Sequence, residues 1–248
     1  FYAPGYYART DEVIAIAEEV GKRNKLYSTH QRDEGTISVG LFTSLNEAIE
    51  TGRRAECKVQ ISHVKCDFQK VWGKADKVLA LIENAVDEGL DVAGDQYPYP
   101  RSSTGITGAL FPRWALSGGR EQTLKIMANE DSRGELIDGI NEMIDQGIGP
   151  EAVLIARYVP DESLEGKNLA EISDLMRIPP AETVLSMYEK GEAMVIEYSM
   201  DENDVDKFAK HHLIAVASDG SSVSKEGILS VGKPHPRSYG TNPRFIQK

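Results

Sequence analysis

Residues 26–34 read LYSTHQRDE, a short extended run that ends in a histidine and four further polar residues. The same order, a short strand followed directly by polar residues, returns in VQISHVK at 59–65 and in LDVAGDQYPY at 90–99. His30 and His63 are 33 residues apart, and the tyrosine of the third run follows after 34 more. This is the length of a strand, a crossover helix and two short loops. The spacing therefore predicts the βα repeat of a parallel barrel or a doubly wound sheet, with functional residues at the carboxyl ends of the strands.

Helical periodicity fills the intervals between these strands and continues after them. Apolar residues at helical spacing predict helices over 11–20 with Thr10 as N-cap, 44–54, 72–88, 121–129, 134–146, 169–176, 181–189 and 202–211. After Tyr99 the rhythm breaks, and two strand-like runs, 153–158 and 193–198, predict a subdomain inserted into the barrel. The apolar run 213–217 is too short for a helix and predicts the next barrel strand.

The composition is that of an acidic globular protein. Its 28 basic and 39 acidic side chains leave a net charge of −11, which repels phosphate backbones, so no nucleic-acid partner is expected. No apolar run approaches the ~20 residues of a membrane helix, so no membrane span is expected either. Cys57 and Cys66 indicate neither a disulfide framework nor a zinc knuckle, and the N-terminus has no secretory signal, which favours a cytoplasmic location. Because the chain does not begin with Met, we expect it to start within a longer protein or to have been processed.

Three side chains at predicted strand ends form a candidate metal site. His30 and His63 follow strands one βα unit apart, and neighbouring strands lie ~4.8 Å apart, so their imidazoles can converge on one zinc ion. Asp219, just after the run 213–217, offers a third ligand. Spacing alone supports a second interpretation equally well, in which the histidines are hydrogen-bonded in loops and Asp219 caps a turn.

Short motifs along the whole chain carry a resemblance to a known family. In order they are THQRDE at 29–34, SHVK at 62–65, DQYPY at 95–99 followed by Ser-Thr-Gly, SDG at 218–220, HPR at 235–237 and YGT at 239–241. This order resembles the N-acyl-D-amino-acid deacylases (D-aminoacylases) of the amidohydrolase superfamily, in the C-terminal part of their catalytic barrel. The resemblance implies an α/β fold, a partial (β/α)8 TIM barrel of about strands five to eight, with an α+β subdomain inserted after strand seven.

The resemblance also implies roles for residues at matching positions. His30 and His63 correspond to zinc ligands from strands five and six. Asp219 corresponds to the strand-eight carboxylate, which is both a ligand and the base that takes a proton from water and returns it to the leaving amine. The residues that correspond to the binding set for the substrate's α-carboxylate are Lys65, Tyr97, Ser103 and Arg237. On residue type alone, Lys65 and Arg237 are also compatible with solvated surface charges.

The expected function is zinc-dependent hydrolysis of an N-acyl-D-amino acid to a carboxylate and a free D-amino acid. The family's His-x-His pair from strand one and its metal-bridging cysteine from strand four have no counterpart here. We therefore expect part of a complete enzyme, and little or no activity from the isolated chain. The expected divisions are barrel units over 1–104, the inserted subdomain over 105–198, and the last barrel strand with a substrate-binding segment over 199–248.

Two alternatives stay open. The first is an amidohydrolase of another substrate, such as a cyclic amide, although the HPR and YPY motifs favour the acylase. The second is a non-catalytic half-barrel that folds by pairing with itself or with a partner chain supplying the missing N-terminal half, since an open sheet edge needs a partner. Zinc retained on dialysis would favour the enzyme over the half-barrel.

Overall fold

The computed structural model describes residues 1–248, which fold as two compact units. The first unit comprises Phe1–Pro100, Met200–Gly220 and Tyr239–Lys248. The second unit comprises Arg101–Ser199 and Ser221–Ser238. The expected inserted subdomain, 105–198, falls within the second unit, which also takes in 221–238 from the segment expected to follow the last barrel strand.

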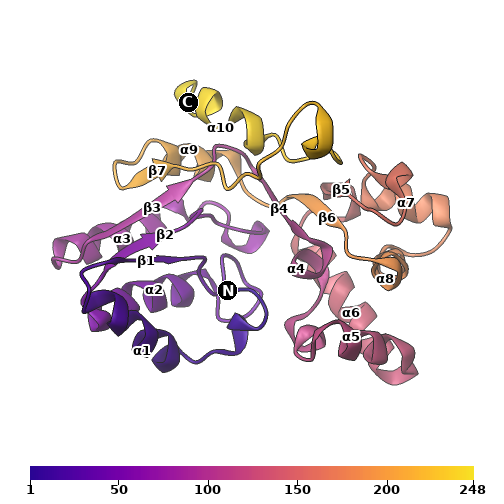
Figure 1. Ribbon diagram of the computed structural model, residues 1–248, viewed down its shortest axis with the longest axis horizontal. Helices are drawn as coiled ribbons and strands as arrows, with labels where there is room; N and C mark the ends of the chain where they lie inside the picture. The colour runs from indigo at the N-terminus through magenta and orange to yellow at the C-terminus, as the bar shows by residue number, and fades with distance from the viewer. The chain divides into compact units, whose positions relative to one another are not determined.

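The first unit is built on a parallel sheet of four strands in the order β1-β2-β3-β7 (Figure 1). The strands are β1 (Leu26–Thr29), β2 (Lys58–Ile61), β3 (Val92–Gln96) and β7 (Ile214–Val216). Thr29 lies opposite Ile61, and Gly94 lies opposite Ile214. The predicted α/β class with a parallel sheet is therefore confirmed, although β3 begins two residues later than the run 90–93 predicted.

Four helices pack against one face of this sheet (Figure 1). They are α1 (Thr10–Gly21), α2 (Leu41–Ala55), α3 (Ala75–Asp87) and α9 (Glu202–Ala209). Their apolar stripes meet alternate strand residues, and Leu45, Ile61 and Ile82 are completely buried in the resulting core. Burying each such side chain stabilises the fold by about 1.5–3 kcal/mol. The polar Ser28 and Gln60, which alternate with the buried residues, face the other side of the sheet.

The starts of α1 and α3 differ from the sequence prediction. Thr10, predicted as the N-cap of α1, is its first helical residue, and the cap is Arg9. α3 begins at Ala75 instead of 72, because the carboxylate of Asp204 on α9 accepts hydrogen bonds from the backbone N of Gly73 and of Ala75. A carboxylate 129 residues away in sequence thus sets where this helix starts.

The second unit is built on an antiparallel sheet of three strands in the order β4-β6-β5. The strands are β4 (Arg101–Gly105), β5 (Val153–Arg157) and β6 (Met194–Tyr198). The apolar runs predicted β5 and β6 to within a residue. β4 was not predicted, because RSSTG has the composition of a loop. It is a strand because it pairs along its length with β6, which supplies the buried Val195 and Ile196.

Helices of the second unit complete its core. They are α4 (Ile106–Leu110), α5 (Gly119–Ala128), α6 (Glu130–Gln146), α7 (Leu169–Met176) and α8 (Pro180–Lys190). Three of them follow the predicted ranges to within two residues, α6 begins four residues before its predicted start, and the short α4 was not predicted. The 3-10 turns of the chain are Gly5–Tyr7, Gln69–Val71, Arg113–Leu116, Pro150–Ala152, Glu162–Leu164 and Gly227–Leu229. The last helix, α10 (Arg237–Ile246), was not predicted, because Gly240 and Pro243 are both unfavourable inside a helix.

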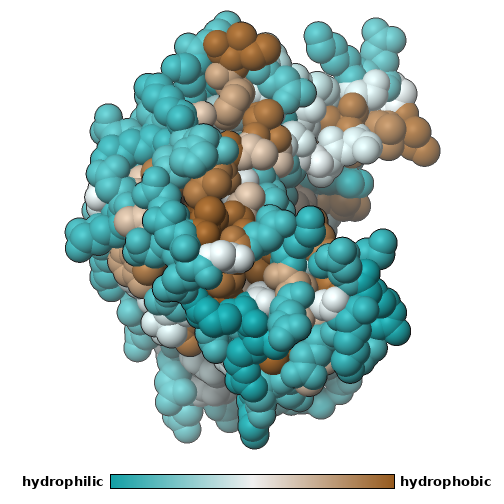
Figure 2. Space-filling view, turned by 90° about the vertical axis from the view of Figure 1, so that its left-hand side faces the viewer, coloured by the Kyte–Doolittle hydropathy of each residue, from teal (hydrophilic) through white to brown (hydrophobic).

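Hydrophilic residues predominate on the side of the molecule shown in Figure 2, and hydrophobic residues form a strip among them. Exposed ion pairs also occur, such as Arg23 with Glu19 at 2.7 Å on α1 and the turn after it. None of the helices combines the length and the apolar character that crossing a membrane would require.

Candidate metal and substrate site

His30 and His63 lie side by side at the carboxyl edge of the parallel sheet. His30 directly follows β1, and the backbone N of Ser62 donates to the O of Thr29 at 2.9 Å, so the two strands stay paired up to this point. His63 has a φ of +40°, and its backbone N donates to Oδ1 of Asp95 at 2.8 Å. Nδ1 of His30 lies 2.9 Å from Nε2 of His63. Two strand ends therefore bring two imidazole nitrogens to one point.

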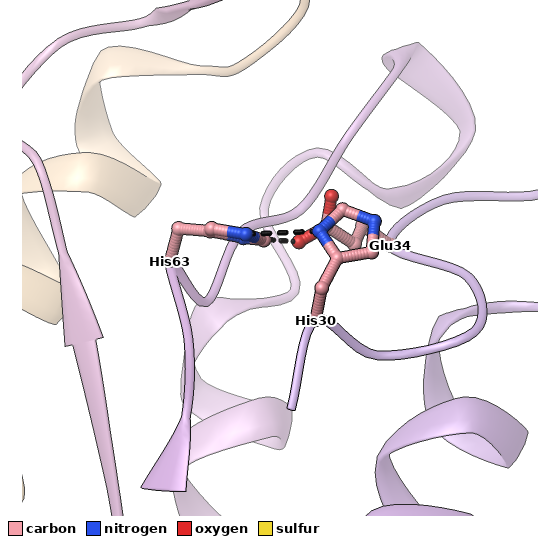
Figure 3. A group of neighbouring side chains, drawn as sticks. All are labelled: His30, Glu34 and His63. Carbon is pink, nitrogen blue, oxygen red and sulfur yellow. Dashed lines mark hydrogen bonds and ion pairs between the residues drawn. The ribbon is translucent and has the colours of Figure 1, made fainter. Parts of the chain in front are cut away.

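Glu34, in the loop after β1, adds a carboxylate to this pair. Its Oε1 lies 2.8 Å from Nδ1 of His63. One possible ligand atom from each of His30, Glu34 and His63 lies within 4.8 Å of the other two. Figure 3 shows the three side chains converging from the two strand ends and the loop.

Lys65 completes a buried group of charges. The residue is 3% exposed, and its Nζ donates to Oε1 of Glu34 at 2.6 Å. Burial alone would raise the pKa of Glu34 and lower that of Lys65. Attraction between the two charges outweighs this effect of burial. It holds the pKa of Glu34 well below its usual value and raises the pKa of Lys65 above its usual value. Both groups are therefore ionised at neutral pH, and the ring of Tyr97 lies 5.9 Å from the ammonium.

His30 is neutral at pH 7. Burial lowers its pKa to about 3, and the positive charge of Lys65 acts in the same direction, whereas the Glu34 carboxylate partly offsets both. The ring also stacks on Tyr2, with centroids 4.5 Å apart. Neutral imidazole is the form in which histidine binds zinc, because the ligand nitrogen must carry a lone pair. A donor set of two imidazoles with a carboxylate beside them fits a zinc ion.

The loop that carries Glu34 is fixed by its neighbour Asp33. The Asp33 carboxylate accepts hydrogen bonds from the backbone N of Gly35 and of Gly40, both at 2.9 Å. The backbone N of Asp67 donates to the O of Glu34 at 2.9 Å, which joins this loop to the one after β2. A Cβ added at Gly35 would lie 2.4 Å from the O of Asp67, so glycine is what permits the close approach of the two loops.

Asp219 stands apart from this group. It follows β7 by three residues, is exposed, and has a φ of +46°. β3 separates β7 from β2, so these two strand ends lie roughly 10 Å apart, two strand spacings. The structure thus brings His30 and His63 together, and it places Asp219 after a strand of the same sheet but outside the set of mutually close ligand atoms.

The remaining residues of the expected carboxylate-binding set divide between the two units. Lys65 and Tyr97 belong to the first unit, whereas Ser103 and Arg237 belong to the second. Nη2 of Arg237 donates to the backbone O of Ser103 at 3.3 Å, and the Ser103 hydroxyl donates to the O of Val195 at 2.8 Å. The single hydroxyl proton of Ser103 is thus used within the sheet, and it would have to turn to reach a ligand.

His235, the first residue of the HPR motif, fixes the position of Arg237. Burial lowers the pKa of His235 to about 4, so its ring is neutral at pH 7. Nδ1 accepts a hydrogen bond from the backbone N of Arg237 at 2.9 Å, and Nε2 donates to the O of Arg101 at 3.0 Å. One imidazole thus holds the Arg237 backbone against the start of β4.

No protein-family model matches the chain. Two similar proteins of Alcaligenes xylosoxydans xylosoxydans are an N-acyl-D-glutamate deacylase, 29% identical over 245 residues, and a D-aminoacylase, 28% identical over 250 residues. Each match covers 99% of this chain and 40% of the relative. The crystal structure of N-acyl-D-glutamate deacylase from Bordetella bronchiseptica, complexed with zinc and a phosphonate inhibitor, is similar with a TM-score of 0.71 and 25% identity over 97% of this chain. A D-aminoacylase crystal structure gives a TM-score of 0.70 and 26% identity over 98% of this chain.

The chain is similar to N-acyl-D-amino-acid deacylases along almost its whole length. The resemblance predicted from the motifs is thereby confirmed. The chain spans about 40% of the length of the curated deacylases that it matches. Among the similar structures, one deacylase is described with zinc and one D-aminoacylase with a binuclear metal center.

Sequence reasoning missed three acidic residues around this site. Glu34 and Asp33 stand inside the THQRDE motif, and Asp95 opens the DQYPY motif, but none of them was given a role. Lys65 carried a usable signal, because a lysine that becomes buried next to a strand end requires a carboxylate partner. That signal does not identify the carboxylate, because Glu34 lies in the loop after β1 and its position depends on the path of that loop.

Proposed function

We propose that this chain forms about strands five to eight of an amidohydrolase (β/α)8 barrel and takes part in zinc-dependent hydrolysis of N-acyl-D-amino acids to a carboxylate and a free D-amino acid. The observation that carries the proposal is the pair of imidazoles facing each other at 2.9 Å, with a buried ammonium held beside them. This arrangement supports a metal ion and an anionic substrate group at one sheet edge. The deacylases named above support the class of substrate.

In this proposal His30 and His63 would hold the zinc ion, and the motif match assigns Asp219 as the third ligand, although it lies outside their set of mutually close ligand atoms. Bound zinc supplies Lewis acidity, which lowers the pKa of water toward ~7. The neutral ring of His30 offers its lone pair without first releasing a proton. The carboxylate of Asp219 takes a proton from the attacking water and returns it to the amide nitrogen, because an amine leaves poorly until it is protonated.

The motif match assigns the α-carboxylate of the substrate to Lys65, Tyr97, Ser103 and Arg237. An ammonium has three N–H donors, so Lys65 keeps two after donating to Glu34. A guanidinium has five, in a planar fork that suits a carboxylate. These two cations are therefore the main expected sources of carboxylate affinity.

Free thiols support a reducing compartment for this function. Cys57 and Cys66 form no disulfide, and Cys66 is buried. Burial raises the pKa of both thiols, which keeps them protonated and unreactive. We place the protein in the cytoplasm on this ground.

Zinc content after dialysis is the direct test. The wild-type chain should retain zinc, and His30→Asn and His63→Asn should each lose it. His212→Asn, at an exposed histidine, is the matched control and should retain zinc. A wild-type chain that emerges metal-free would favour the non-catalytic half-barrel. We expect little turnover of N-acetyl-D-methionine by the chain alone, because the resemblance assigns further ligands to barrel strands one and four, which the chain does not contain.

Arg237→Ala tests the carboxylate assignment. Calorimetric affinity for N-acetyl-D-methionine should fall by about 2–5 kcal/mol, because a charged hydrogen bond is left unmade. This is a loss of roughly thirtyfold or more. The carboxamide of the same compound is the control, and its weak binding should hardly change. An equal loss for both compounds would assign Arg237 to structure alone.

A further inference from the structure

Three atoms meet behind the His63 ring, on the side away from His30. Oε1 of Glu34 lies 2.8 Å from Nδ1 of His63 and 2.6 Å from Nζ of Lys65, and Nζ lies 2.9 Å from Nδ1. One carboxylate oxygen therefore contacts both a candidate metal ligand and a candidate substrate-binding cation. The proposed function gives Glu34 no role.

The charges at this meeting point favour one tautomer of His63. An ionised carboxylate only accepts hydrogen bonds, so its 2.8 Å contact with Nδ1 is favourable when Nδ1 carries the proton. A deprotonated Nδ1 could accept from the Lys65 ammonium at 2.9 Å, but it would set its lone pair against the carboxylate oxygen, which lies closer at 2.8 Å and already accepts from that ammonium at 2.6 Å. With the proton on Nδ1, the lone pair of the ring lies on Nε2, the atom that faces His30.

We propose that Glu34 is a positioning residue that holds the Nδ1–H tautomer of His63 and orients the ammonium of Lys65, so that metal binding and carboxylate binding share one carboxylate. The inference deepens the proposed function and rests on it for the roles of His63 and Lys65. A carboxylate behind a metal-ligating histidine fixes the orientation of the ring and makes its ligand nitrogen more basic.

The backbone around Glu34 is built to keep the carboxylate in this position. The backbone O of Glu34 accepts a hydrogen bond from the backbone N of Asp67. The Asp33 carboxylate accepts hydrogen bonds from the backbone N of Gly35 and of Gly40 in the following loop. Glu34 is therefore held by both the loop after β1 and the loop after β2. A side chain on a fixed backbone can determine the geometry of its partners, because it does not move to follow them.

Direct ligation of the metal by Oε1 of Glu34 is the competing role. Oε1 already accepts from the Lys65 ammonium at 2.6 Å, and a divalent cation on the same oxygen would lie against that positive charge. Occupation by two donors and repulsion by Lys65 both favour the positioning role over ligation.

The first test reads the His63 tautomer directly in the metal-free chain, by long-range ¹H–¹⁵N NMR on ¹⁵N-histidine-labelled protein. Wild type should show the proton on Nδ1. Because removing Glu34 alone leaves a buried charge on Lys65 and endangers folding, the test variant is Glu34→Leu with Lys65→Met. It should lose the Nδ1–H preference, and Glu34→Gln with Lys65→Met should restore part of it. Wild type with the proton on Nε2, or an unchanged tautomer in the Leu/Met variant, would overturn the inference.

The second test is zinc affinity by competition with a chelator. The Leu/Met double variant should bind zinc about 10–100-fold more weakly than wild type, the usual effect of losing such a partner. Glu34→Gln with Lys65→Met should recover part of that affinity. Glu47→Gln is the matched control, because Glu47 pairs with Arg32 at 2.7 Å in another ion pair shielded from solvent, and it should bind zinc normally. A loss well beyond 100-fold in the Leu/Met variant would mark Glu34 as a ligand and overturn the positioning role.

The two proposals fail in distinguishable ways. A wild-type chain that binds no zinc but carries the Nδ1 proton on His63 would overturn the metal assignment of the proposed function and the metal part of this inference, while the tautomer control by Glu34 would stand. A wild-type chain that binds zinc as tightly as the Leu/Met variant would leave the metal assignment intact and overturn the role of Glu34.

Discussion

The β1–β2 end and the β7 end of the parallel sheet each carry a motif of the deacylases, but they are built differently. At the β1–β2 end, Glu34 and Lys65 are shielded from solvent and joined to His63 by contacts of 2.6–2.9 Å. At the β7 end, Asp219 is exposed after a strand of only three residues. A motif determines which strand a residue follows, whereas the burial of opposite charges determines how firmly that residue is held.

Removing a carboxylate should have its largest effect on stability at the β1–β2 end. Glu34→Ala leaves the Lys65 charge buried without its carboxylate, so the free energy of unfolding should fall by about 3–5 kcal/mol. Asp219→Asn, at an exposed position whose left-handed backbone Asn tolerates, should change it by no more than about 1 kcal/mol. Urea denaturation of both variants measures the difference, and equal losses would remove the contrast between the two ends.

Adding one methyl group at Gly35 should have an intermediate effect. Its Cβ would lie 2.4 Å from a backbone oxygen, so Gly35→Ala should force the loops after β1 and β2 apart and cost about 1–3 kcal/mol. Gly134→Ala is the control, because Gly134 is an exposed residue of α6 with open space around its Cβ position. There the same change should stabilise the fold by about 0.5–1 kcal/mol. Thermal unfolding would show shifts of opposite sign, and two shifts of the same sign would contradict the packing argument.

Per pH unit, mild acid should have the smallest effect, and it should act on the β1–β2 end. Burial lowers the pKa of His30 from 6.5 to about 3 in the folded chain. Below about pH 6.5 the unfolded chain binds a proton that the folded chain does not, so stability present above that pH is lost as pH falls toward 3, by at most about 1.4 kcal/mol per unit. Glu34, whose pKa is also depressed, adds a further loss below about pH 4.

Urea midpoints between about pH 7 and 5 would measure the contribution of His30. His30→Asn should flatten the decline, and His212→Asn should leave it as steep as in wild type. A decline of the same slope in the His30 variant would assign it to other groups.

Sequence periodicity was sufficient for the parallel sheet and insufficient for β4 and α10. The strand before His63 buries Val59 and Ile61 in alternation, and the strands before His30 and His63 both lie beside amphipathic helices, so the pattern is local to each segment. β4 is polar and becomes a strand only through its pairing with β6, about 90 residues later. α10 forms although Gly240 and Pro243 oppose it. The secondary structure of segments that depend on distant partners is therefore hard to predict from their own residues.

The site shows the same division between local and distant information. Residue types and strand positions placed His30 and His63 correctly at neighbouring strand ends, because parallel strands end at one edge. The contact of Glu34 with His63 and Lys65 could not be predicted in the same way, since it depends on the path of a loop. Hydrogen bonds to Asp33 and a close approach at Gly35 determine that path.

The division of the first unit into separate chain segments has a consequence for how the protein is made. β3 ends at Gln96 and its neighbour β7 starts at Ile214, so a ribosome must synthesise the intervening segment before the sheet can gain its fourth strand. Closing a flexible loop of about a hundred residues carries an entropic barrier of roughly 4 kcal/mol. In the folded chain the backbone N of Met200 donates to the backbone O of Pro100 at 3.1 Å, so the two ends of the segment between these residues are adjacent. If the second unit folds first, it brings the two ends of this segment together, and the entropic cost of adding β7 to the parallel sheet is then smaller.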